Sequence, residues 1–289
     1  MYENKPYVIA EAGCNHKGEM EIAKELIRVA AQICNADAIK FQKRCNKELL
    51  TEEQYNAPHP NPINSYGATY GEHREFLEFT VEQHAQLKKW CEEYGITYST
   101  SVWDLTSAKE IASLKPEFIK IPSACNNHFE MLEWLCDNYE GEIQLSFGMT
   151  THEEEEEIVR LFERKGRNKD LVLFNCTSGY PVPFEDICLL EITRMREQFA
   201  DRVKKIGFSG HHLGIAADVA AMALGAEVFE RHYTLDRTWK GTDHAASLEP
   251  DGVRRLVRDL NNVHKALTFK SQEILPIEQV QRDKLKFRK

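Results

Sequence analysis

The chain has 289 residues, of which 42% are hydrophobic and 29% are charged, so it is long enough to bury a large core. Its net charge of -9 and the mixing of basic with acidic residues argue against a nucleic-acid-binding face. No segment approaches the roughly 18 apolar residues of a membrane span. The N-terminus does not read as a signal peptide, and the eight dispersed cysteines form no CxxC pair, so we expect a reduced, cytoplasmic protein.

Short apolar segments alternate with amphipathic segments along the chain. Eight strand–helix units in about 250 residues are typical of a TIM (β/α)8 barrel, which we predict as a single domain over residues 1–268. A doubly wound sheet is the alternative, but the turn at 11–18 lacks the GxGxxG pattern of that fold. The expected strands are 7–13, 36–42, 96–102, 118–123, 142–148, 171–177, 205–211 and 226–234. The expected helices are 19–35, 81–94, 105–114, 129–138, 152–165, 186–200, 214–224 and 251–268.

Three segments call for a separate interpretation. Residues 44–80 are rich in proline and asparagine, and a loop of this length is usually functional, so we expect a lid or a subunit contact. Thr151 and Glu154 form a capping-box pattern, which makes the acidic run 153–157 a feature of a helix start rather than of catalysis. The polar and basic residues 269–289 are expected to form a surface extension.

Two histidines end neighbouring predicted strands, in Ser209-Gly210-His211 and Glu230-Arg231-His232. Adjacent parallel strands would bring both imidazoles to one rim of a barrel. Neutral imidazoles with a nearby carboxylate are suitable ligands for a divalent metal. The alternative is that one histidine is structural and the other is solvated.

Lys40 and Lys120 lie inside apolar strand segments. A buried ammonium is costly unless an anion pairs with it, and that anion could be a substrate or a neighbouring acid such as Glu11. Several polar residues stand at the same strand ends, where the active site of a TIM barrel is found. These are Ser99, Thr100, Ser101, Ser123, Ser146, Asn175, Thr177, Ser178, Tyr180 and Ser209. Together they predict a metal-assisted enzyme that acts on a small phosphorylated carboxylate.

Five segments, 9–16, 40–42, 176–181, 207–211 and 230–232, resemble the sialic acid (N-acetylneuraminate) synthase family, in order, within residues 7–268. The resemblance implies a transferase that condenses phosphoenolpyruvate (PEP) with an aldose, N-acetylmannosamine or a related hexose. The products would be a nine-carbon 3-deoxy-2-keto acid and phosphate. It also implies a divalent metal cofactor, with Mn2+ expected and Mg2+ or Co2+ as alternatives.

The resemblance carries roles to individual residues. It implies that His211 and His232 bind the metal and that Gln42 and Tyr180 lie near the sugar, with Glu230 and Asp243 around the metal and sugar. The positions that match PEP ligands are Lys40, Thr100, Lys120, Ser123, Ser146 and Ser209. We expect Asn175, from the strand-end set, to contact substrate as well. The residues expected to be catalytic are Lys40, Lys120, His211, His232 and Glu230.

The sequence departs from the family pattern in three places. Cys125 stands where an acid is usual, and Ser178 stands where an asparagine is usual. The small C-terminal antifreeze-like domain of typical members is not expected here, so recognition of an N-acetyl group stays open. Cys14 is a further candidate metal ligand, in a set with Glu230, Asp243 and either His211 or His232. The alternative is that Cys14 is a small buried residue at the end of its strand.

Two other functions stay open. One is a synthase that uses a phosphorylated sugar, for which Lys43, Arg44, Arg237 and Lys240 are candidate phosphate ligands. The other is an inactive barrel in surface-layer or spore-coat assembly, which the retained lysines and histidines oppose. For a synthase that uses a free sugar or a phosphorylated sugar, we expect small-molecule substrates and a homo-oligomer. We expect no nucleic-acid partner and no membrane partner.

Overall fold

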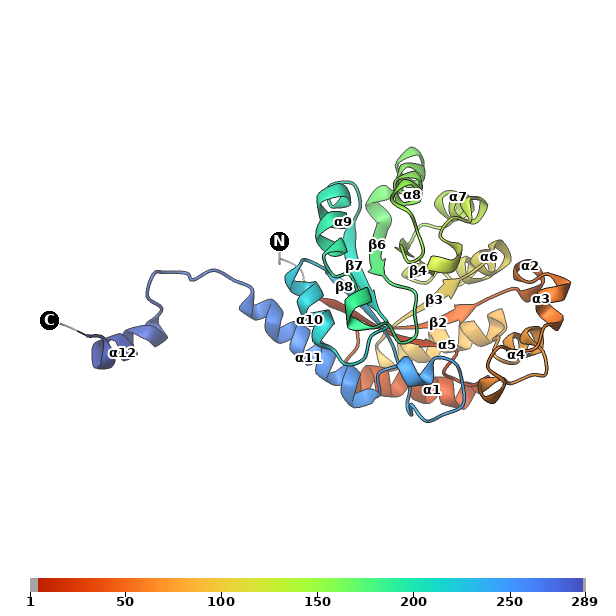
Figure 1. The fold of residues 1–289 in the computed structure, drawn as a ribbon, viewed down its shortest axis with the longest axis horizontal. Coiled ribbons are helices and arrows are strands. Elements are labelled where there is room, and N and C mark those ends of the chain that lie inside the picture. The colour runs from red at the N-terminus through yellow and green to blue at the C-terminus, as the bar shows by residue number, and fades with distance from the viewer. Residues whose placement is uncertain (1–4, 288–289) are drawn as a thin grey trace.

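A closed barrel of eight parallel strands, hydrogen-bonded in sequence order, forms the centre of the molecule. The structure is a computed structural model that describes residues 5–287. It confirms the predicted TIM (β/α)8 barrel and excludes the doubly wound sheet (Figure 1). The strands are β1 Tyr7–Gly13, β2 Ala38–Lys43, β3 Thr97–Val102, β4 Phe118–Ile121, β5 Glu142–Ser146, β6 Leu171–Cys176, β7 Lys205–Gly210 and β8 Val228–His232.

Helices surround the strands as an outer ring (Figure 1). The predicted helix 19–35 is divided, because α1 ends at Val29 and a π-helical turn, Ala30–Cys34, continues it. The capping box of Thr151 and Glu154 is present at the start of α8, which confirms a structural use for the acids there. The helices of the ring are α1 Met20–Val29, α5 Val81–Tyr94, α6 Leu105–Ser113, α7 Phe129–Asn138, α8 His152–Arg164, α9 Glu191–Phe199, α10 Ala216–Ala223 and α11 Pro250–Ala266.

The apolar core has two parts, because successive side chains of a strand point to opposite faces. The larger part fills the space between the strands and the helices. The smaller part lies inside the barrel and includes Ile9, Phe118, Val172, Phe174 and Val228. Four of these residues stand in the first half of their strands, and Phe174 lies under the Lys120 ammonium, so together they close the interior below the carboxyl ends. The polar residues that follow at alternate positions face the remaining space.

The segment between β2 and α5 is more regular than the predicted loop. It contains α2 Asn46–Leu49, α3 Glu52–Asn56 and α4 Tyr70–Phe76. Reciprocal capping boxes begin α3 and α4, at Thr51 and Thr69, and explain why such short helices form. In Figure 1 these helices lie beside the barrel mouth, next to β2 and β3.

Beyond the barrel, an extended segment leads from α11 to a further helix, α12 Pro276–Leu285, which lies apart from the barrel (Figure 1). The side chains of Ile277 and Leu285 on α12 are exposed. A domain boundary at residue 268 stays a prediction. Within residues 5–287, no helix has both the length and the apolar character needed to cross a membrane.

A buried ionic cluster fixes β8 against α10. The Arg231 guanidinium donates to Asp218 Oδ2 at 2.5 Å and to the carbonyl oxygen of His212 at 2.6 Å. The same Asp218 oxygen lies 3.2 Å from Nε2 of His212. Because Arg231 points outward, its neighbours in the strand, Glu230 and His232, point into the barrel. The cluster therefore sets the orientation of two residues inside the cavity.

We predict that Asp218→Asn lowers the free energy of unfolding by about 3–5 kcal/mol, because it leaves the buried Arg231 without its counter-charge. Urea denaturation followed by circular dichroism measures the change. The matched control is Asp251→Asn, which breaks an exposed pair with Arg255 on α11 and is expected to leave the midpoint nearly unchanged. Equal effects of the two substitutions would contradict the anchoring role of Asp218.

Candidate active site

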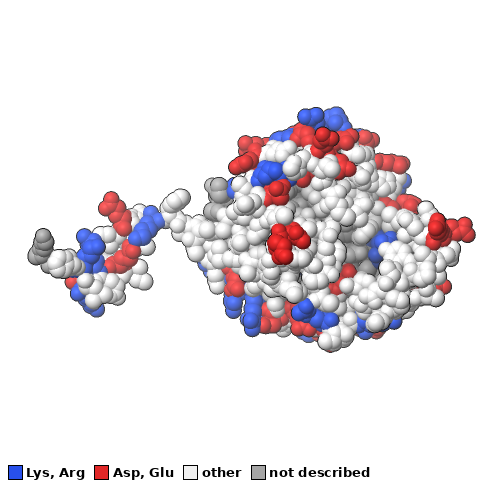
Figure 2. Space-filling view, in the orientation of Figure 1, with Lys and Arg blue, Asp and Glu red and all other residues white. Residues whose placement is uncertain are grey.

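A cavity of about 340 Å³ opens at the carboxyl ends of the strands. Figure 2 shows a hollow in this face of the molecule, with basic atoms at its edge. Inward-facing residues of all eight strands, and residues of the loops that follow several of them, form its walls. The lining residues are Glu11, Lys40, Gln42, Ser101, Trp103, Lys120, Pro122, Ser123, Ala124, Ser146, Met149, Cys176, Ser178, Tyr180, Ser209, His211, Glu230 and His232.

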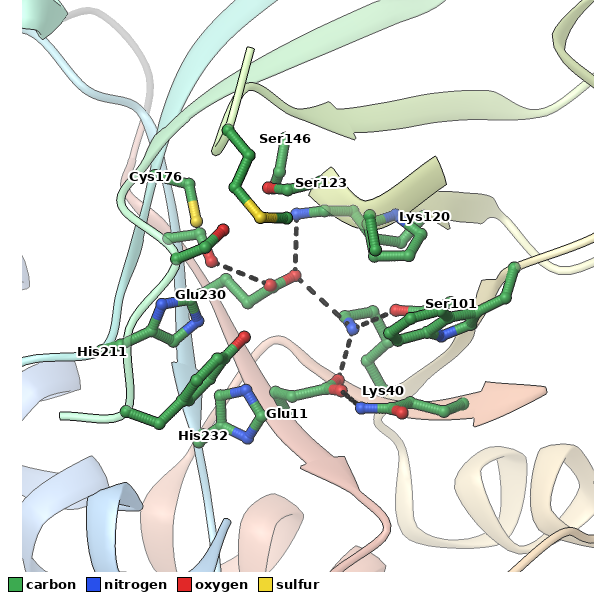
Figure 3. Close-up of a pocket in the computed structure, with 18 residues that line it drawn as sticks. Glu11, Lys40, Ser101, Lys120, Ser123, Ser146, Cys176, His211, Glu230 and His232 are labelled. Atoms are coloured by element: carbon green, nitrogen blue, oxygen red, sulfur yellow. Dashed lines mark hydrogen bonds and ion pairs between the residues drawn. The ribbon is translucent and has the colours of Figure 1, made fainter. Parts of the chain in front are cut away.

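Two buried lysines share carboxylates at the centre of this cavity (Figure 3). The Lys120 ammonium lies 3.0 Å from Glu230 Oε2, and the Lys40 ammonium lies 3.7 Å from the same oxygen. Lys40 also forms an ion pair with Glu11 and donates to Ser101 Oγ at 2.5 Å. Glu11, which the sequence suggested as a counter-charge, therefore does pair with Lys40. Both lysines still face the cavity.

Burial and neighbouring charges act in opposite directions on the pKa values of these lysines and carboxyl groups. Burial lowers the pKa of Lys120, and the carboxylate of Glu230 opposes that shift. Burial raises the pKa of Glu11 against the effect of Lys40. For Glu230, burial acts upward, but Lys120 and Lys40 together outweigh it and lower its pKa. With two ammonium groups and two carboxyl groups, the centre of the cavity can be electrically balanced without a ligand.

Hydroxyl groups form a small cradle beside the lysines. Ser123 Oγ accepts a hydrogen bond from the backbone N–H of Gly148 at 3.0 Å. A Cβ atom at position 148 would lie 2.6 Å from Ser123 Oγ and 2.5 Å from Ser178 Oγ, so only glycine leaves room here. Ser209 adds a hydroxyl that donates to Glu230 at 3.0 Å. The cradle offers neutral donors next to Lys120, an arrangement suited to phosphate oxygens.

The two histidines face each other across from the lysines, as Figure 3 shows. The ring centroids of His211 and His232 are 5.4 Å apart, and the ring of Tyr180 packs on both. His211 Nδ1 lies 2.9 Å from the carbonyl oxygen of Thr177, so this nitrogen carries the proton and Nε2 is left to bind a ligand. Burial, and then the charge of His232, lower the pKa of His211 to about 4, which keeps the imidazole neutral.

These features fit a divalent metal. Nδ1 of His232 is buried and has no hydrogen-bond partner among the described residues, and its nearest carboxylate oxygen is Oδ2 of Asp243, at 3.9 Å. Neutral imidazoles of this kind are common metal ligands. Cys14 is placed differently, because its Sγ accepts from Arg44 at 3.1 Å and burial raises its pKa to about 12. It does not line the cavity formed by the histidines.

A second group of donors lies outside this cavity. Cys45, Glu48 and Asp104 place three ligand atoms within 4.8 Å of one another, and this group could hold a metal ion. It is the one such group of three within residues 5–287. The carboxylate of Asp104 already accepts from the backbone N–H groups of Cys45 and Ser107, which makes it the N-cap of α6.

Three residues assigned from the sequence lie outside the cavity lining. Thr100 points outward and donates to the Tyr98 hydroxyl at 2.7 Å, because it alternates with the inward-facing Ser101. Asn175 alternates in the same way with Phe174 and Cys176. Thr100 and Asn175 therefore do not face the cavity in this structure, and their contact with substrate stays a prediction. Asp243 lies near His232 but not on the cavity wall.

Other assigned residues do line the cavity. Besides the lysines, Glu230 and the histidines, they are Gln42, Ser123, Ser146, Tyr180 and Ser209. The sequence interpretation placed Ser101 and Ser178 in the strand-end set without an individual role, and it considered Glu11 only as a counter-charge. It gave no role to Trp103, Met149 or Cys176. The two-residue periodicity of the strands favours Ser101 over Thr100 and Cys176 over Asn175.

Comparisons with known proteins agree with this geometry. The sequence profile of the NeuB family matches residues 26–272. N-acetylneuraminate-9-phosphate synthase of Homo sapiens is 39% identical over 284 residues, which cover 96% of this chain and 76% of that protein. N,N'-diacetyllegionaminic acid synthase of Campylobacter jejuni is 31% identical, over 91% of this chain and 78% of that protein. The crystal structure of N-acetylneuraminic acid (sialic acid) synthetase from Leptospira borgpetersenii, in complex with citrate, has a TM-score of 0.82 and 28% identity, covering 98% of this chain and 93% of that one.

We predict that Glu230→Gln lowers the free energy of unfolding by about 3 kcal/mol, because two buried ammonium groups lose the carboxylate they share. The double variant with Lys120→Met should lose less than the sum of the two single variants, since it removes one of the unpaired charges. Urea denaturation of the four proteins measures this coupling. Strictly additive effects would show that Lys120 and Glu230 do not act as a pair.

Proposed function

The chain belongs to the NeuB family, and from this premise we propose that it condenses PEP with N-acetylmannosamine or a related hexose. The products are a nine-carbon 3-deoxy-2-keto acid, of the sialic acid type, and inorganic phosphate. The protein is a carbon–carbon bond-forming transferase of carbohydrate biosynthesis. The observation that supports the reaction most strongly is one cavity with two lysines and a hydroxyl cradle on one side and two histidines on the other.

PEP binds on the lysine side of the cavity. Its phosphate lies in the cradle of Ser123 and Ser178, beside the ammonium of Lys120. Its carboxylate lies toward Lys40 and Ser101, which already share a hydrogen bond. The lysines hold the charge of the phosphate while the bond to it breaks, because fixed cations in a site closed to water stabilise developing negative charge.

The sugar aldehyde lies on the histidine side, with Gln42 and Tyr180 as neighbours. His211 and His232 would hold the divalent metal, with Asp243 nearby, and Mn2+ is the metal we propose. When bound, such an ion polarises a carbonyl oxygen as a Lewis acid. The hydrogen bond from His211 to Thr177 keeps the ring oriented toward the cavity.

The reaction forms a carbon–carbon bond and a carbon–oxygen bond to water, and it breaks the carbon–oxygen bond that joins PEP carbon 2 to its phosphate. Carbon 3 of PEP attacks the aldehyde carbon, and the aldehyde oxygen takes up a proton. Water adds to carbon 2 and loses a proton, for which Glu230 and Glu11 are the bases on the cavity wall. The resulting tetrahedral centre expels phosphate by cleavage of its carbon–oxygen bond, which leaves the 2-keto acid. The buried lysines Lys40 and Lys120 stay in contact with the anionic groups throughout.

A phosphorylated hexose is the second candidate substrate. PEP contributes three carbons, so position 9 of the product comes from position 6 of the sugar. The human relative is named as a 9-phosphate synthase, and this favours a hexosamine 6-phosphate. The Campylobacter jejuni relative is named for a product without a phosphate, which favours the free sugar.

We propose a cytoplasmic location and a homo-oligomeric state. All eight cysteines are free thiols, which is consistent with a reducing compartment. Symmetric homo-oligomers are common among enzymes of this size.

The test of the proposed function is an assay of PEP consumption. The full chain is incubated with PEP, Mn2+ and N-acetylmannosamine, mannose or the 6-phosphate of either sugar, and both PEP and inorganic phosphate are followed. We expect one phosphate released for each PEP consumed, with at least one of these aldoses. A protein that folds and binds Mn2+ but consumes no PEP with any of them would refute the proposal.

We predict that His232→Ala weakens Mn2+ binding by more than tenfold and reduces turnover by orders of magnitude, because a neutral nitrogen ligand is lost. Equilibrium dialysis measures the bound metal independently of activity. The matched control is His152→Ala, which removes an exposed histidine at the start of α8. Unchanged metal affinity in the His232 variant would remove this residue from the metal site.

A further inference from the structure

Met149 lies in the wall of the active-site cavity, in a backbone conformation that is unfavourable for its residue type. Its φ of 56° is in the left-handed region, which a residue with a Cβ atom adopts only at a cost in free energy. Met149 is also 71% exposed, although its side chain is large and apolar. Glycine at this position would remove both costs. Residues strained in this way are concentrated at active sites and ligand clamps, and Met149 does line the cavity.

The conformation of Met149 is imposed by contacts on both of its sides. Before it, the backbone N–H of Gly148 donates to Ser123 Oγ at 3.0 Å, which holds the chain against the hydroxyl cradle. After it, the Thr150 hydroxyl donates to the carbonyl oxygen of Gly148 at 2.9 Å and accepts from Asn126 at 2.6 Å. Asn126 also donates to the last carbonyl group of β5, at 2.9 Å. These bonds fix the turn between β5 and α8, so the left-handed φ is a constraint of this site.

This turn brings Met149 to the lysine side of the cavity, where the proposed function places PEP. Its neighbour Gly148 lies so close to the cradle that a Cβ atom there would be 2.6 Å from Ser123 Oγ. Tyr180, which is 55% exposed, lies on the histidine side, where its ring packs on His211. Within residues 5–287, Met149 and Tyr180 are the two large exposed apolar residues in the cavity wall. Each substrate therefore has one such side chain beside it.

We propose that Met149 covers bound PEP, and that the left-handed turn is retained because it holds this side chain over the phosphate. The inference rests on the proposed function and adds to it a residue that determines the affinity for PEP. Methionine suits this role because its unbranched, flexible chain adapts to the surface that it contacts. Covering the phosphate removes apolar surface from water, and it strengthens the attraction of Lys40 and Lys120 for the phosphate by excluding water.

The first experiment measures the accessibility of Met149 itself. The full chain is treated with dilute hydrogen peroxide in Mg2+ buffer, with and without saturating PEP, and the sulfoxide at each methionine is followed by peptide mass spectrometry. We expect PEP to slow the oxidation of Met149 by at least fivefold. Met20, half-buried at the start of α1 and outside the cavity lining, is the internal control and should oxidise equally in both samples. Equal oxidation of Met149 with and without bound PEP would overturn the inference.

The second experiment separates the cover from the backbone strain. Met149→Ala removes most of the side chain but keeps a Cβ atom in the left-handed region, whereas Met149→Gly removes both. Calorimetric titration should show that both variants bind PEP about tenfold more weakly, the effect of losing one apolar contact. Met149→Leu keeps the apolar volume and should recover most of this affinity. In steady-state assays the KM for PEP should rise by the same factor, while the KM for the aldose stays unchanged.

Thermal melts followed by circular dichroism report on the strain. Met149→Gly should raise the Tm by about 1–3 °C, because glycine adopts this φ without a steric penalty. The matched control is Lys115→Gly, because Lys115 has a φ of 50° and lies between α6 and β4, at the amino ends of the strands. It should raise the Tm similarly and bind PEP as wild type does. A lower Tm of Met149→Gly with unchanged PEP affinity would show that Met149 serves the fold alone.

The outcomes distinguish this inference from the function on which it rests. If PEP protects Met149 and Met149→Ala weakens PEP binding, but no aldose supports PEP consumption, the cover stands and the synthase reaction falls. If an aldose does support PEP consumption and the KM for PEP is the same in wild type and Met149→Ala, the reaction stands and the cover is refuted. A wild-type protein that does not bind PEP would refute both.

Discussion

The site depends on ammonium and carboxyl groups held together inside a closed barrel. Lys40 and Lys120 approach one carboxylate, that of Glu230, and Glu11 supplies the second acid. Each of these groups alone would be costly to bury, because a low-dielectric interior does not solvate an isolated charge. As a set they balance, and the apolar floor that includes Phe118 and Phe174 can lie directly beneath them. The barrel can therefore carry a polar centre directly above an apolar floor.

This balance also explains how the cavity can accept an anion. A substrate with a phosphate and a carboxylate brings its own negative charge, and the lysines can turn from the protein carboxylates toward it. Glu230 and Glu11 then remain next to the reacting centre as proton acceptors. The same residues thus stabilise the empty cavity and take part in the reaction.

The sequence predicted much of this site because strand periodicity is strong in a barrel. Lys40 and Gln42, or Glu230 and His232, stand two residues apart and so face the same side. The same rule separates Thr100 and Asn175 from the cavity, since they have the opposite parity to the cavity-lining Ser101 and Cys176. The helices within residues 44–80 were missed although their Thr-x-x-Gln and Thr-x-x-Glu capping boxes are visible in the sequence. Without those helices, the position of Arg74 beside Trp103 could not be anticipated, because it depends on tertiary contacts rather than on periodicity.

Strand β8 shows how narrowly such a site is specified. Its last three residues alternate in, out and in: Glu230 faces the lysines, Arg231 is held by Asp218 outside, and His232 faces His211. A slip of β8 by one position against β1 and β7 would exchange the two faces. The guanidinium would enter among the ammonium groups, while a carboxylate and an imidazole would meet the apolar side of α10. Insertions or deletions are therefore expected to be tolerated in the segment that carries α2 to α4 and to be lethal to activity within β8.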